Sequence, residues 1–481
     1  MILCLAESSF GFFGLTSKFN NHDEPFIPHT NRFLLLNPKA VVTKWIEQRL
    51  DNFNPQDGRR WNMRYMENAV HFQSGGPIFI YVGGEWSIGA GSISDGSHIY
   101  DLAKELNGMI YYTEHRFYGQ SHPLNDTSTE NLRFLSIDQA LADLANFITH
   151  VKSSVDGLGQ SGVIMVGGSY SATMVAWMRQ KYPHLVNGSW ASSAPIHAQV
   201  DFFEYKEVMA NGIKRVGGDE CYDTVANAFV EMERLVDEGY TAPLTSAFNL
   251  CWALNVTTDS AHFFYEISDI VAGLVQGHRA GRIESACDFM QRQKTENNAT
   301  DLEAFGAWVL NGQWTCLDMS YANNIQKYRE INWSAEANRQ MRQWIYQTCT
   351  EFAWFQTSTS TNQIFGSPRL YPVDYFVSLC EDLYDTAFNL TLIERNVART
   401  NVRYGGFNLS LTNVYFTNGD LDPWHPMSLL EDLNDSTPST MLPLSAHVAD
   451  LGKIALSDSN EMRASKERIR ELVHEWLGVL E

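Results

Sequence analysis

The chain has 481 residues, too many for one compact core, so its length predicts two domains or one domain with a large insertion. Its 44% hydrophobic and 12% aromatic content exclude a disordered chain. With 35 Lys and Arg against 56 Asp and Glu the formal net charge is −21, and so acidic a surface excludes nucleic acid and anionic membranes as main partners.

Residues 1–40 are interpreted as a leader or propeptide-like segment. Residues 1–16 are mildly apolar, but they have no basic start and Glu7 interrupts the apolar run. This pattern leaves two interpretations open, a secretory signal peptide and a truncated or wrongly assigned start. No segment of the chain reaches the roughly 18 uncharged apolar residues that a membrane helix needs, so we expect no membrane insertion.

Residues 41–198 alternate between strand patterns and helix patterns. Short apolar runs at Pro77–Gly84, Gly108–Arg116 and Val163–Gly168 predict buried strands, and Ser136–Lys152 carries apolar residues at helical spacing. Continuous apolar strands between helices indicate a mostly parallel sheet that is covered on both faces.

Residues 199–400 have a different character, because helical patterns dominate, for example at Asp223–Glu238 and Asn338–Trp344. Six clustered cysteines in this stretch allow 15 disulfide pairings or a set of reduced thiols. The sequence contains no C-x-x-C pair, so we expect no metal cluster, and no cofactor is predicted. These cysteines are Cys221, Cys251, Cys287, Cys316, Cys349 and Cys380.

Residues 401–481 return to the first pattern, with a strand at Asn413–Asn418 and an amphipathic helix at Glu461–Leu480. The simplest architecture is an α/β sheet domain, made of residues 41–198 and 401–481, that is interrupted by a helical, disulfide-stapled insertion at 199–400.

The number of N-x-S/T sequons favours the secretory pathway. Some sequons arise by chance, but eight of them together with an even set of clustered cysteines predict a secreted or lysosomal protein. The predicted glycosylation sites are Asn125, Asn187, Asn255, Asn298, Asn332, Asn389, Asn408 and Asn434.

The best candidate for a catalytic residue is Ser169, in a segment, Val163–Tyr182, that reads as strand, tight turn and helix. The nucleophile elbow of α/β-hydrolases needs small residues on both sides of a strained serine, in the pattern G-x-S-x-G. Two glycines precede Ser169, and Ser171 stands in place of the last glycine. A plain Gly-Ser turn before a helix is the alternative, and the flanking strand and helix favour the elbow.

Two backbone N–H groups bind the oxyanion in such hydrolases. We expect one to be the N–H of Tyr170, at the start of the helix, and the other to come from Gly84 or Glu85, in the loop after an early strand. The Glu85 carboxylate is also a candidate to bind a substrate amine, although a surface or helix-capping acid is the simpler interpretation.

The acid and the base follow the nucleophile in the chain order Ser, then Asp or Glu, then His. Asp420 and Asp422 compete for the acid, and His425 and His447 compete for the base. His425 lies only three residues from Asp422, whereas His447 lies 25 residues on, far enough for a helix and a strand between them. Chain order therefore favours Asp422 and His447, and the alternatives are a turn acid and a solvent-exposed histidine.

Several longer motifs resemble the family of lysosomal prolyl carboxypeptidase, dipeptidyl peptidase II and thymus-specific serine protease. The resemblance runs through nearly the whole chain and looks closest to the thymus-specific branch. The motifs are Gln48–Asn54 (QRLDNFN), Glu114–Gly119 (EHRFYG), Leu132–Ser136 (LRFLS), Gln139–Asp143 (QALAD), Gly167–Tyr170 (GGSY), Trp190–Ile196 (WASSAPI), Trp344–Phe352 (WIYQTCTEF) and Asn418–His425 (NGDLDPWH).

This resemblance implies an α/β-hydrolase fold in which the large helical, disulfide-stapled insertion forms a lid over the active site. It places Ser169, Asp422 and His447 in the catalytic triad. It further implies a homodimer and, from the family's cysteine order, the disulfides Cys221–Cys287, Cys251–Cys316 and Cys349–Cys380.

The family cleaves peptides after proline, so the resemblance implies peptide substrates and an apolar pocket for the proline ring. The pocket positions correspond here to Trp424, to Trp354 and to Thr173 beside Met174. Thr173 stands where a relative has Met, which argues against a strict proline preference. Branches of the family remove either a C-terminal residue or an N-terminal dipeptide, and the sequence carries no charge signature that decides between the two modes.

The sequence thus predicts a serine exopeptidase that cleaves after proline through an acyl-enzyme at acidic to neutral pH. An esterase or lipase is one alternative, because fold alone does not fix function. A catalytically silent secreted binding protein that keeps the hydrolase scaffold is the other.

Overall fold

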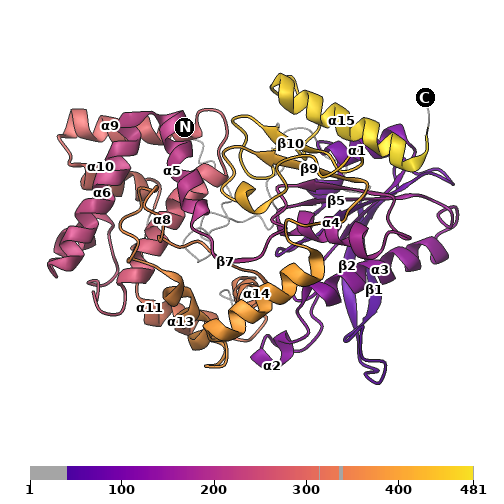
Figure 1. Cartoon of the computed structure of the whole chain (residues 1–481), viewed down its shortest axis with the longest axis horizontal. Helices are drawn as coiled ribbons and strands as arrows, with labels where there is room; N and C mark the ends of the chain where they lie inside the picture. Colours follow the sequence, from indigo (N-terminus) through magenta and orange to yellow (C-terminus); the bar gives the residue numbers. More distant parts are fainter. Residues whose placement is uncertain (1–40, 314, 335–339, 480–481) are drawn as a thin grey trace.

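The computed structural model describes residues 41–313, 315–334 and 340–479. The predicted leader, and the first residues of the helix expected at Asn338–Trp344, lie outside this part of the chain. A sheet with its flanking helices forms one end of the molecule and a group of helices forms the other (Figure 1). Within the described ranges, no helix combines the length and the apolar character that crossing a membrane requires.

One eight-stranded sheet forms the centre of the first end. Its strands are β1 (Val41–Arg49), β2 (Arg60–Asn68), β3 (Ile78–Val82), β4 (Met109–Thr113), β5 (Val163–Gly168), β6 (Gly188–Ser192), β9 (Val414–Gly419) and β10 (Ser439–Leu442). Their order is β1-β2-β4-β3-β5-β6-β9-β10. The pairs β1–β2 and β2–β4 are antiparallel and the other five pairs are parallel, which confirms the mostly parallel sheet.

Helices cover both faces of this sheet, so every residue of β3, β4, β5, β6 and β9 is buried. Ile164 and Val166 of β5 pack on one side, in a cluster with residues of α1 (His98–Glu105) and α15 (Asn460–Leu477). Their neighbours Val163 and Met165 pack on the other side, with α3 (Ile137–Ser154) and α4 (Tyr170–Lys181). This two-sided burial is what continuous apolar strands predict.

The sequence patterns do not predict β1, β2 or β6. Only two of the nine β1 residues, Ile46 and Gln48, are buried, so this edge strand carries no continuous apolar run. Strand β6 reads Gly-Ser-Trp-Ala-Ser and is fully buried, but its small residues give no strand signal. Pairing with neighbouring strands, which a local pattern does not report, therefore decides these elements.

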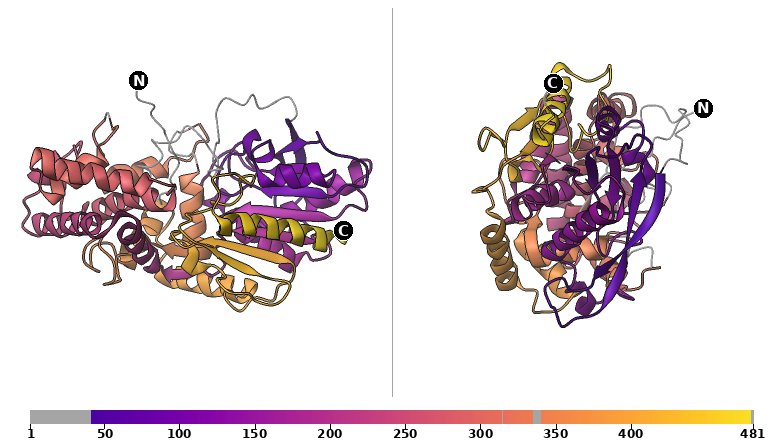
Figure 2. Two further views of the ribbon diagram at one scale, coloured as in Figure 1. Left: turned by 90° about the horizontal axis from the view of Figure 1, so that it is seen from above. Right: turned by 90° about the vertical axis from the view of Figure 1, so that its right-hand side faces the viewer.

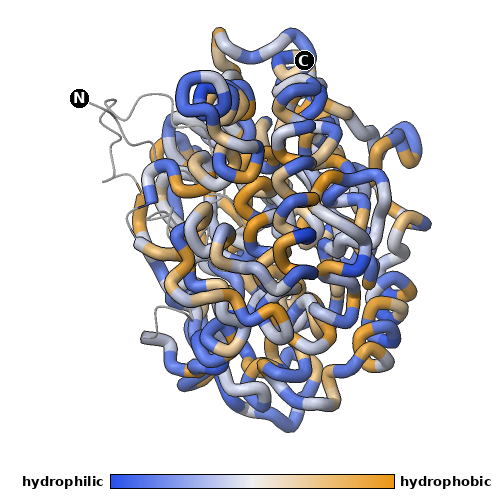
Figure 3. The backbone as a smooth tube through the Cα atoms, turned by 90° about the vertical axis from the view of Figure 1, so that its left-hand side faces the viewer, coloured by the Kyte–Doolittle hydropathy of each residue, from blue (hydrophilic) through white to orange (hydrophobic). Residues whose placement is uncertain are grey.

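The helices of the insertion form the second end, which Figure 2 shows beside the sheet along the long axis of the molecule. Figure 3 looks onto this end and shows hydrophobic and hydrophilic stretches alternating along the backbone, as amphipathic helices require. The helices are α5 (Glu204–Gly217), α6 (Asp219–Asp237), α7 (Ala242–Ala247), α8 (Ser260–Gln276), α9 (Arg282–Asn297), α10 (Asp301–Val309), α11 (Tyr321–Arg329), α12 (Met341–Gln347) and α13 (Val373–Leu383).

Shorter elements link the two ends. A two-stranded parallel sheet pairs β7 (Gln199–Asp201) with β8 (Ala353–Phe355), and α14 (Leu390–Tyr404) leads the chain back to β9. The remaining elements are η3 (Ala90–Ile93), α2 (Thr129–Leu132), the π-helical turn η5 (Thr348–Phe352) and η6 (His425–Met427).

Three disulfides staple the insertion, and they are the pairs that the family resemblance implies. Cys221–Cys287 joins α6 to α9, Cys251–Cys316 joins two loops, and Cys349–Cys380 joins η5 to α13. One hydrophobic cluster runs without a break from the sheet into these helices. The domain boundaries at residues 198 and 400 therefore stay a prediction, while the α/β-hydrolase fold with a disulfide-stapled helical insertion is confirmed.

Candidate active site

Ser169 occupies the sharp turn between β5 and α4. Its backbone has φ 60° and ψ −133°, a left-handed conformation that costs a non-glycine residue about 1–3 kcal/mol. The Ser169 N–H donates to the Ser192 carbonyl at the end of β6 (2.9 Å), which holds the turn in place. Strain retained at one partly exposed serine is typical of a nucleophile elbow.

The residues around Ser169 explain why this turn needs small side chains. A Cβ atom on Gly167 would lie 2.4 Å from the Ser171 carbonyl oxygen, and one on Gly168 would lie 2.5 Å from Val448. The Ser171 hydroxyl, at the position where the elbow pattern has glycine, donates to the Gly168 carbonyl (2.9 Å) and accepts from the Gly168 N–H (3.0 Å). Ser171 is therefore accommodated because its hydroxyl bonds within the turn.

Asp422 and His447 are in direct contact. The Nδ1 atom of His447 lies 2.8 Å from each carboxylate oxygen of Asp422. The Asp422 side chain is fully buried, and it also accepts the N–H of Trp424 (3.0 Å). An imidazole held through Nδ1 presents Nε2 outward, which is the orientation that a general base needs.

The two competing residues lie in other surroundings. Asp420 forms an ion pair with Arg215 (2.6 Å) and accepts the N–H of Leu444 (2.7 Å). His425 begins the short helix η6, and its backbone N–H donates to the Asp422 carbonyl (3.1 Å). The connection from Asp422 to His447 contains η6 and β10 with no α-helix, so the intervening helix expected from the 25-residue spacing is absent from this fully described stretch.

The chain that follows His447 packs against the nucleophile turn. The Val448 N–H donates to the Ser193 hydroxyl (2.9 Å), and the Val448 side chain lies against Gly168, the residue before Ser169. The His447 N–H donates to the Gln276 carbonyl at the end of α8 (3.1 Å). The sheet and the insertion thus both position the loop that carries His447.

Tyr170, the predicted oxyanion donor, is the first residue of α4. Its buried hydroxyl lies 3.1 Å from Nε2 of His115 and accepts from the Gln347 side chain (2.8 Å), whose oxygen in turn accepts from Tyr118 (2.6 Å). Burial lowers the pKa of His115 to about 3, so this imidazole is neutral. Gln347 ends α12, and the insertion therefore contacts the residue next to Ser169.

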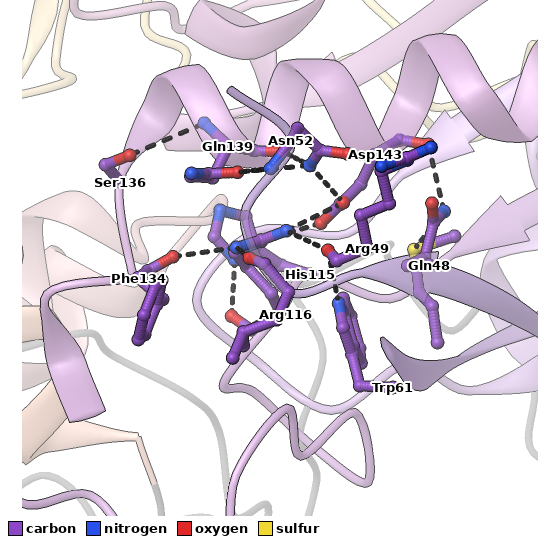
Figure 4. A network of polar contacts seen from close by, with 12 residues as sticks. Gln48, Arg49, Asn52, Trp61, His115, Arg116, Phe134, Ser136, Gln139 and Asp143 are labelled. Carbon is purple, nitrogen blue, oxygen red and sulfur yellow. Dashed lines mark hydrogen bonds and ion pairs between the residues drawn. The ribbon is translucent and has the colours of Figure 1, made fainter. Parts of the chain in front are cut away.

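A buried ion pair lies next to His115 in the chain and ties several of the family-like motifs together (Figure 4). The Arg116 guanidinium binds both carboxylate oxygens of Asp143 (2.7 and 2.8 Å) and donates to the carbonyls of Leu50 and Phe134. The Asn52 amide also donates to Asp143 (2.9 Å). Both charges are almost inaccessible, so the motifs around Asn52, Arg116, Phe134 and Asp143 act as one structural unit.

The loop after β3 carries Gly84 and Glu85 beside Ser169. A Cβ atom on Gly84 would lie 2.5 Å from the Trp86 ring, so only glycine fits there. Gln340 lies at the start of α12. Both polar atoms of its side chain are satisfied when its NH₂ group donates to the Glu85 carbonyl and its oxygen accepts from the Ser87 N–H (3.1 Å each). The insertion therefore also fixes this loop.

A cavity opens at Ser169, with about 560 Å³ of empty space that includes its open mouth. Trp354 and Trp424 line it, as the sequence predicts, and their rings meet nearly at right angles (84°) with centroids 5.6 Å apart. Two bonds fix these rings, from Trp354 Nε1 to the His197 carbonyl (2.7 Å) and from Trp424 Nε1 to the Gln276 side chain (3.0 Å). The residues around the cavity are Glu85, Ser169, Tyr170, Pro195, Gln276, Gln340, Met341, Trp344, Trp354, Gln356 and Trp424.

Met174 is not among them, so its predicted role in substrate binding has no support from its position. It is fully buried in α4 and lines a separate small cavity with residues such as Met63 and Val82. The helix turns its side chain towards the sheet core, away from Ser169. The neighbouring Thr173 contributes indirectly, because its hydroxyl donates to the carbonyl of Pro195 (2.9 Å), which does line the site.

Six lining residues were not predicted from the sequence: Pro195, Gln276, Gln340, Met341, Trp344 and Gln356. Pro195 and Trp344 lie inside motifs quoted above, which offered a signal. Gln276 ends α8, whereas Gln340 and Gln356 lie on either side of α12 and β8, and nothing in the local sequence of the three glutamines marks them.

Burial raises the pKa of Glu85 to about 7, because its carboxyl group is taken out of water while few groups bind the charged form. The side chain is 8% exposed, and Oε2 has no hydrogen-bond partner within the described structure. Glu85 is therefore neither a surface acid nor a helix cap.

Seven of the eight predicted glycosylation sites are exposed. Asn187 is the exception, because it is partly buried and lies directly before β6. Its side chain accepts the N–H of Val163 (2.9 Å) and its amide lies 3.4 Å from the Trp476 carbonyl. The structure therefore disfavours Asn187 as a glycan acceptor.

Comparison with known proteins places this architecture in a family. The model of the family described as Serine carboxypeptidase S28 matches residues 48–469. Thymus-specific serine protease of Mus musculus is 33% identical over 456 residues, covering 92% of this chain and 88% of that protein, and its Homo sapiens counterpart is also 33% identical, over 465 residues, covering 92% and 89%. Lysosomal Pro-X carboxypeptidase of Homo sapiens is 28% identical over 465 residues, covering 90% and 89%. The chain therefore belongs to the serine carboxypeptidase S28 family and is a serine-type peptidase.

Proposed function

We propose that this peptidase is an exopeptidase that cleaves after proline through Ser169, Asp422 and His447. The observation that carries the proposal is Ser169 in a strained turn at the wall of an aromatic cavity, with a neighbouring loop that holds a buried Asp–His pair. The name of one relative, Lysosomal Pro-X carboxypeptidase, agrees with a preference for proline.

The proposed reaction proceeds through an acyl-enzyme. His447 takes the proton of the Ser169 hydroxyl, and Ser169 attacks the carbonyl carbon of the scissile bond. Asp422 holds the imidazole tautomer through Nδ1 and stabilises its positive charge. His447 then gives the proton to the leaving amine, and water hydrolyses the acyl-enzyme by the reverse sequence of proton transfers.

Two backbone N–H groups are proposed to bind the oxyanion, those of Tyr170 and Gly84. Tyr170 begins α4, where N–H groups lack partners within the helix and the helix dipole favours negative charge. Gly84 lies on the loop that reaches the same cavity, and the absence of a side chain lets its backbone approach the substrate closely. The bond from Gln340 to the carbonyl of Glu85 supports a fixed geometry for this loop.

The corner formed by Trp354 and Trp424 is proposed to hold the proline ring. Proline is compact and has no backbone N–H to satisfy, so flat aromatic walls suit it. Ala353 and Trp354 both have positive φ angles (55° and 54°), which is costly for residues with side chains. That the fold retains this costly backbone conformation beside the cavity supports a role for Trp354 in substrate binding.

Replacing the nucleophile tests the proposal. Ser169→Ala should abolish hydrolysis of Xaa-Pro peptides and labelling by a fluorophosphonate probe, while Ser154→Ala, at the exposed end of α3, should retain both. Hydrolysis by Ser169→Ala at the rate of the parent would exclude the triad. Faster turnover of simple acyl esters than of prolyl peptides would indicate the esterase alternative, and an absence of labelling in the parent would indicate the silent binding protein.

We also propose that the protein is secreted or lysosomal. Three disulfides persist only in an oxidising compartment, and seven exposed sequons are compatible with glycosylation there. Immunofluorescence of the full chain, combined with the mobility shift caused by a deglycosylating enzyme, measures both properties.

A further inference from the structure

The last residue of α8, Gln276, joins the insertion to the sheet at two points. Its backbone carbonyl accepts the N–H of His447 (3.1 Å), and its side-chain oxygen accepts the Nε1–H of Trp424 (3.0 Å). The residue is buried and lines the cavity that opens at Ser169. A substitution at Gln276 removes the contact with Trp424 and keeps the backbone contact with His447, so the two contacts are separable.

The partners of this amide fix its orientation. The hydroxyl of Tyr205 donates to the same oxygen, Oε1 (2.7 Å), which therefore accepts two hydrogen bonds. An indole N–H only donates, so the amide cannot be turned around to place its NH₂ group against Trp424. Tyr205 is fully buried in α5, and its ring packs edge-on against the Trp424 ring with centroids 5.6 Å apart. Two helices of the insertion, α5 and α8, thus hold the indole.

The two tryptophans of the proposed proline pocket are held in different ways. Trp354 Nε1 donates to a backbone carbonyl, that of His197, which is present whatever side chain stands there. The backbone N–H of Trp424 donates to Asp422, but its ring depends on a side chain of the insertion. Trp424 is only 7% exposed, so an indole N–H without an acceptor is costly and the ring would move towards another one.

We propose that Gln276 is a positioning residue that sets the preference for proline, because it fixes the Trp424 ring in the corner with Trp354. The proposal rests on the proposed function and assigns its specificity to the insertion. A compact proline ring gains from two closely placed aromatic walls, whereas an alanine methyl group gains little from them. The backbone contact with His447 is independent of this role, so KM rather than kcat carries the effect.

Two tripeptides, Ala-Pro-Phe and Ala-Ala-Phe, measure the preference, because removal of the C-terminal residue and release of the N-terminal dipeptide cut the same bond. Gln276→Met keeps the length of the side chain but offers only a weakly accepting sulfur. We expect the ratio of kcat/KM for the prolyl over the alanyl peptide to fall by about 5- to 50-fold, through KM, as for a buried donor left without its acceptor. Gln276→Glu keeps an oxygen acceptor and should restore most of the preference.

The matched control is Gln293→Met on α9, which removes a side-chain oxygen elsewhere in the insertion, one that accepts from Asn297 (2.7 Å). It should leave the ratio unchanged. Fluorophosphonate labelling at the parental rate shows that a variant keeps its fold and its reactive serine. If Gln276→Met does not fold, Tyr205→Phe removes only the hydroxyl that holds the amide and should lower the ratio in the same direction.

The outcomes separate this inference from the proposed function. An unchanged ratio in the folded variant, or an equal loss in Gln276→Glu, shows that the side-chain oxygen of Gln276 does not set the preference, and the proposed peptidase with its proline pocket stands. A parental ratio near one shows instead that the proline pocket itself is wrong, and this proposal fails with it. If the parent neither labels nor hydrolyses either tripeptide, the proposed function fails as well.

Discussion

The imidazole of His447 and the carboxylate of Asp422 face each other with Nδ1 equidistant, at 2.8 Å, from both carboxylate oxygens. The carboxylate is fully buried while the ring retains 8% exposure on its side chain. The pair therefore has one buried end that fixes the ring and one end that keeps some contact with solvent.

Removing the charge of Asp422 should strongly lower kcat without unfolding the protein. Asp422→Asn presents an amide to Nδ1, which favours the wrong imidazole tautomer, and we expect kcat to fall by about 10⁴-fold. Asp420→Asn is the matched control, because Asp420 lies two residues away on the same loop and binds Arg215. Equal losses in the two variants, measured on one prolyl substrate, would contradict the assignment.

The hydroxyl of Tyr170 should matter for stability and for rate. Tyr170→Phe leaves the side chains of His115 and Gln347 without their shared partner, at a cost of about 1–3 kcal/mol in the free energy of unfolding. Because Tyr170 begins α4 beside Ser169, we also expect a lower kcat with little change in KM. Urea denaturation and steady-state kinetics measure the two effects, with Tyr182→Phe at the other end of α4 as the control. A variant with parental kcat would show that this contact does not position the oxyanion donor.

The ion pair between Arg116 and Asp143 should be costly to break. Asp143→Asn leaves a buried guanidinium without its counter-ion, and we expect a loss of about 3–5 kcal/mol. Asp237→Asn interrupts an exposed pair with Arg369 and should cost less than about 1 kcal/mol. Urea midpoints compare the two variants, and similar losses would show that burial does not determine the cost.

Glu351 should make the folded state less stable as the pH rises. Burial, with a smaller effect from the nearby Asp138, raises its pKa from 4.5 to about 8, although the Ile137 N–H, Gln347 and Arg399 favour the charged form. The folded state therefore holds this proton when the unfolded chain has lost it, so stability from this group is complete below pH 4.5 and is lost as the pH rises towards 8.

Glu351→Gln keeps an acceptor for the Ile137 N–H but cannot ionise. We expect its melting temperature to fall by several degrees less than that of the parent between pH 5 and pH 8. Differential scanning fluorimetry at both pH values measures the difference, and parallel pH profiles would contradict the prediction. Glu303→Gln, at the exposed N-terminus of α10, controls for the loss of a carboxylate.

The sequence predicted those features that short segments encode. The β5–Ser169–α4 turn follows from an apolar run, two glycines and a helix pattern, and the spacing from Asp422 favoured His447 over His425. Strand β6 was not predicted because four of its five residues, all except Trp190, are small, and only its neighbours in the sheet identify it.

Contacts between distant segments explain the other differences. Met174 lies one helical turn from Tyr170, and only the packing of α4 on the sheet shows that it faces the core. Glu85 looked like a surface acid because the residues that enclose it, such as Gln340, lie more than 250 positions later in the chain. Local sequence records neither burial nor such partners.

The residues that line the cavity are not spread evenly along the chain. Five of its eleven lining residues come from one stretch, 340–356, which contains α12, η5 and β8: Gln340, Met341, Trp344, Trp354 and Gln356. Ser169 and His447, the proposed nucleophile and base, lie outside that stretch, on the turn between β5 and α4 and on the loop after β10. Substitutions within this single stretch therefore reshape the cavity wall without changing Ser169, Asp422 or His447.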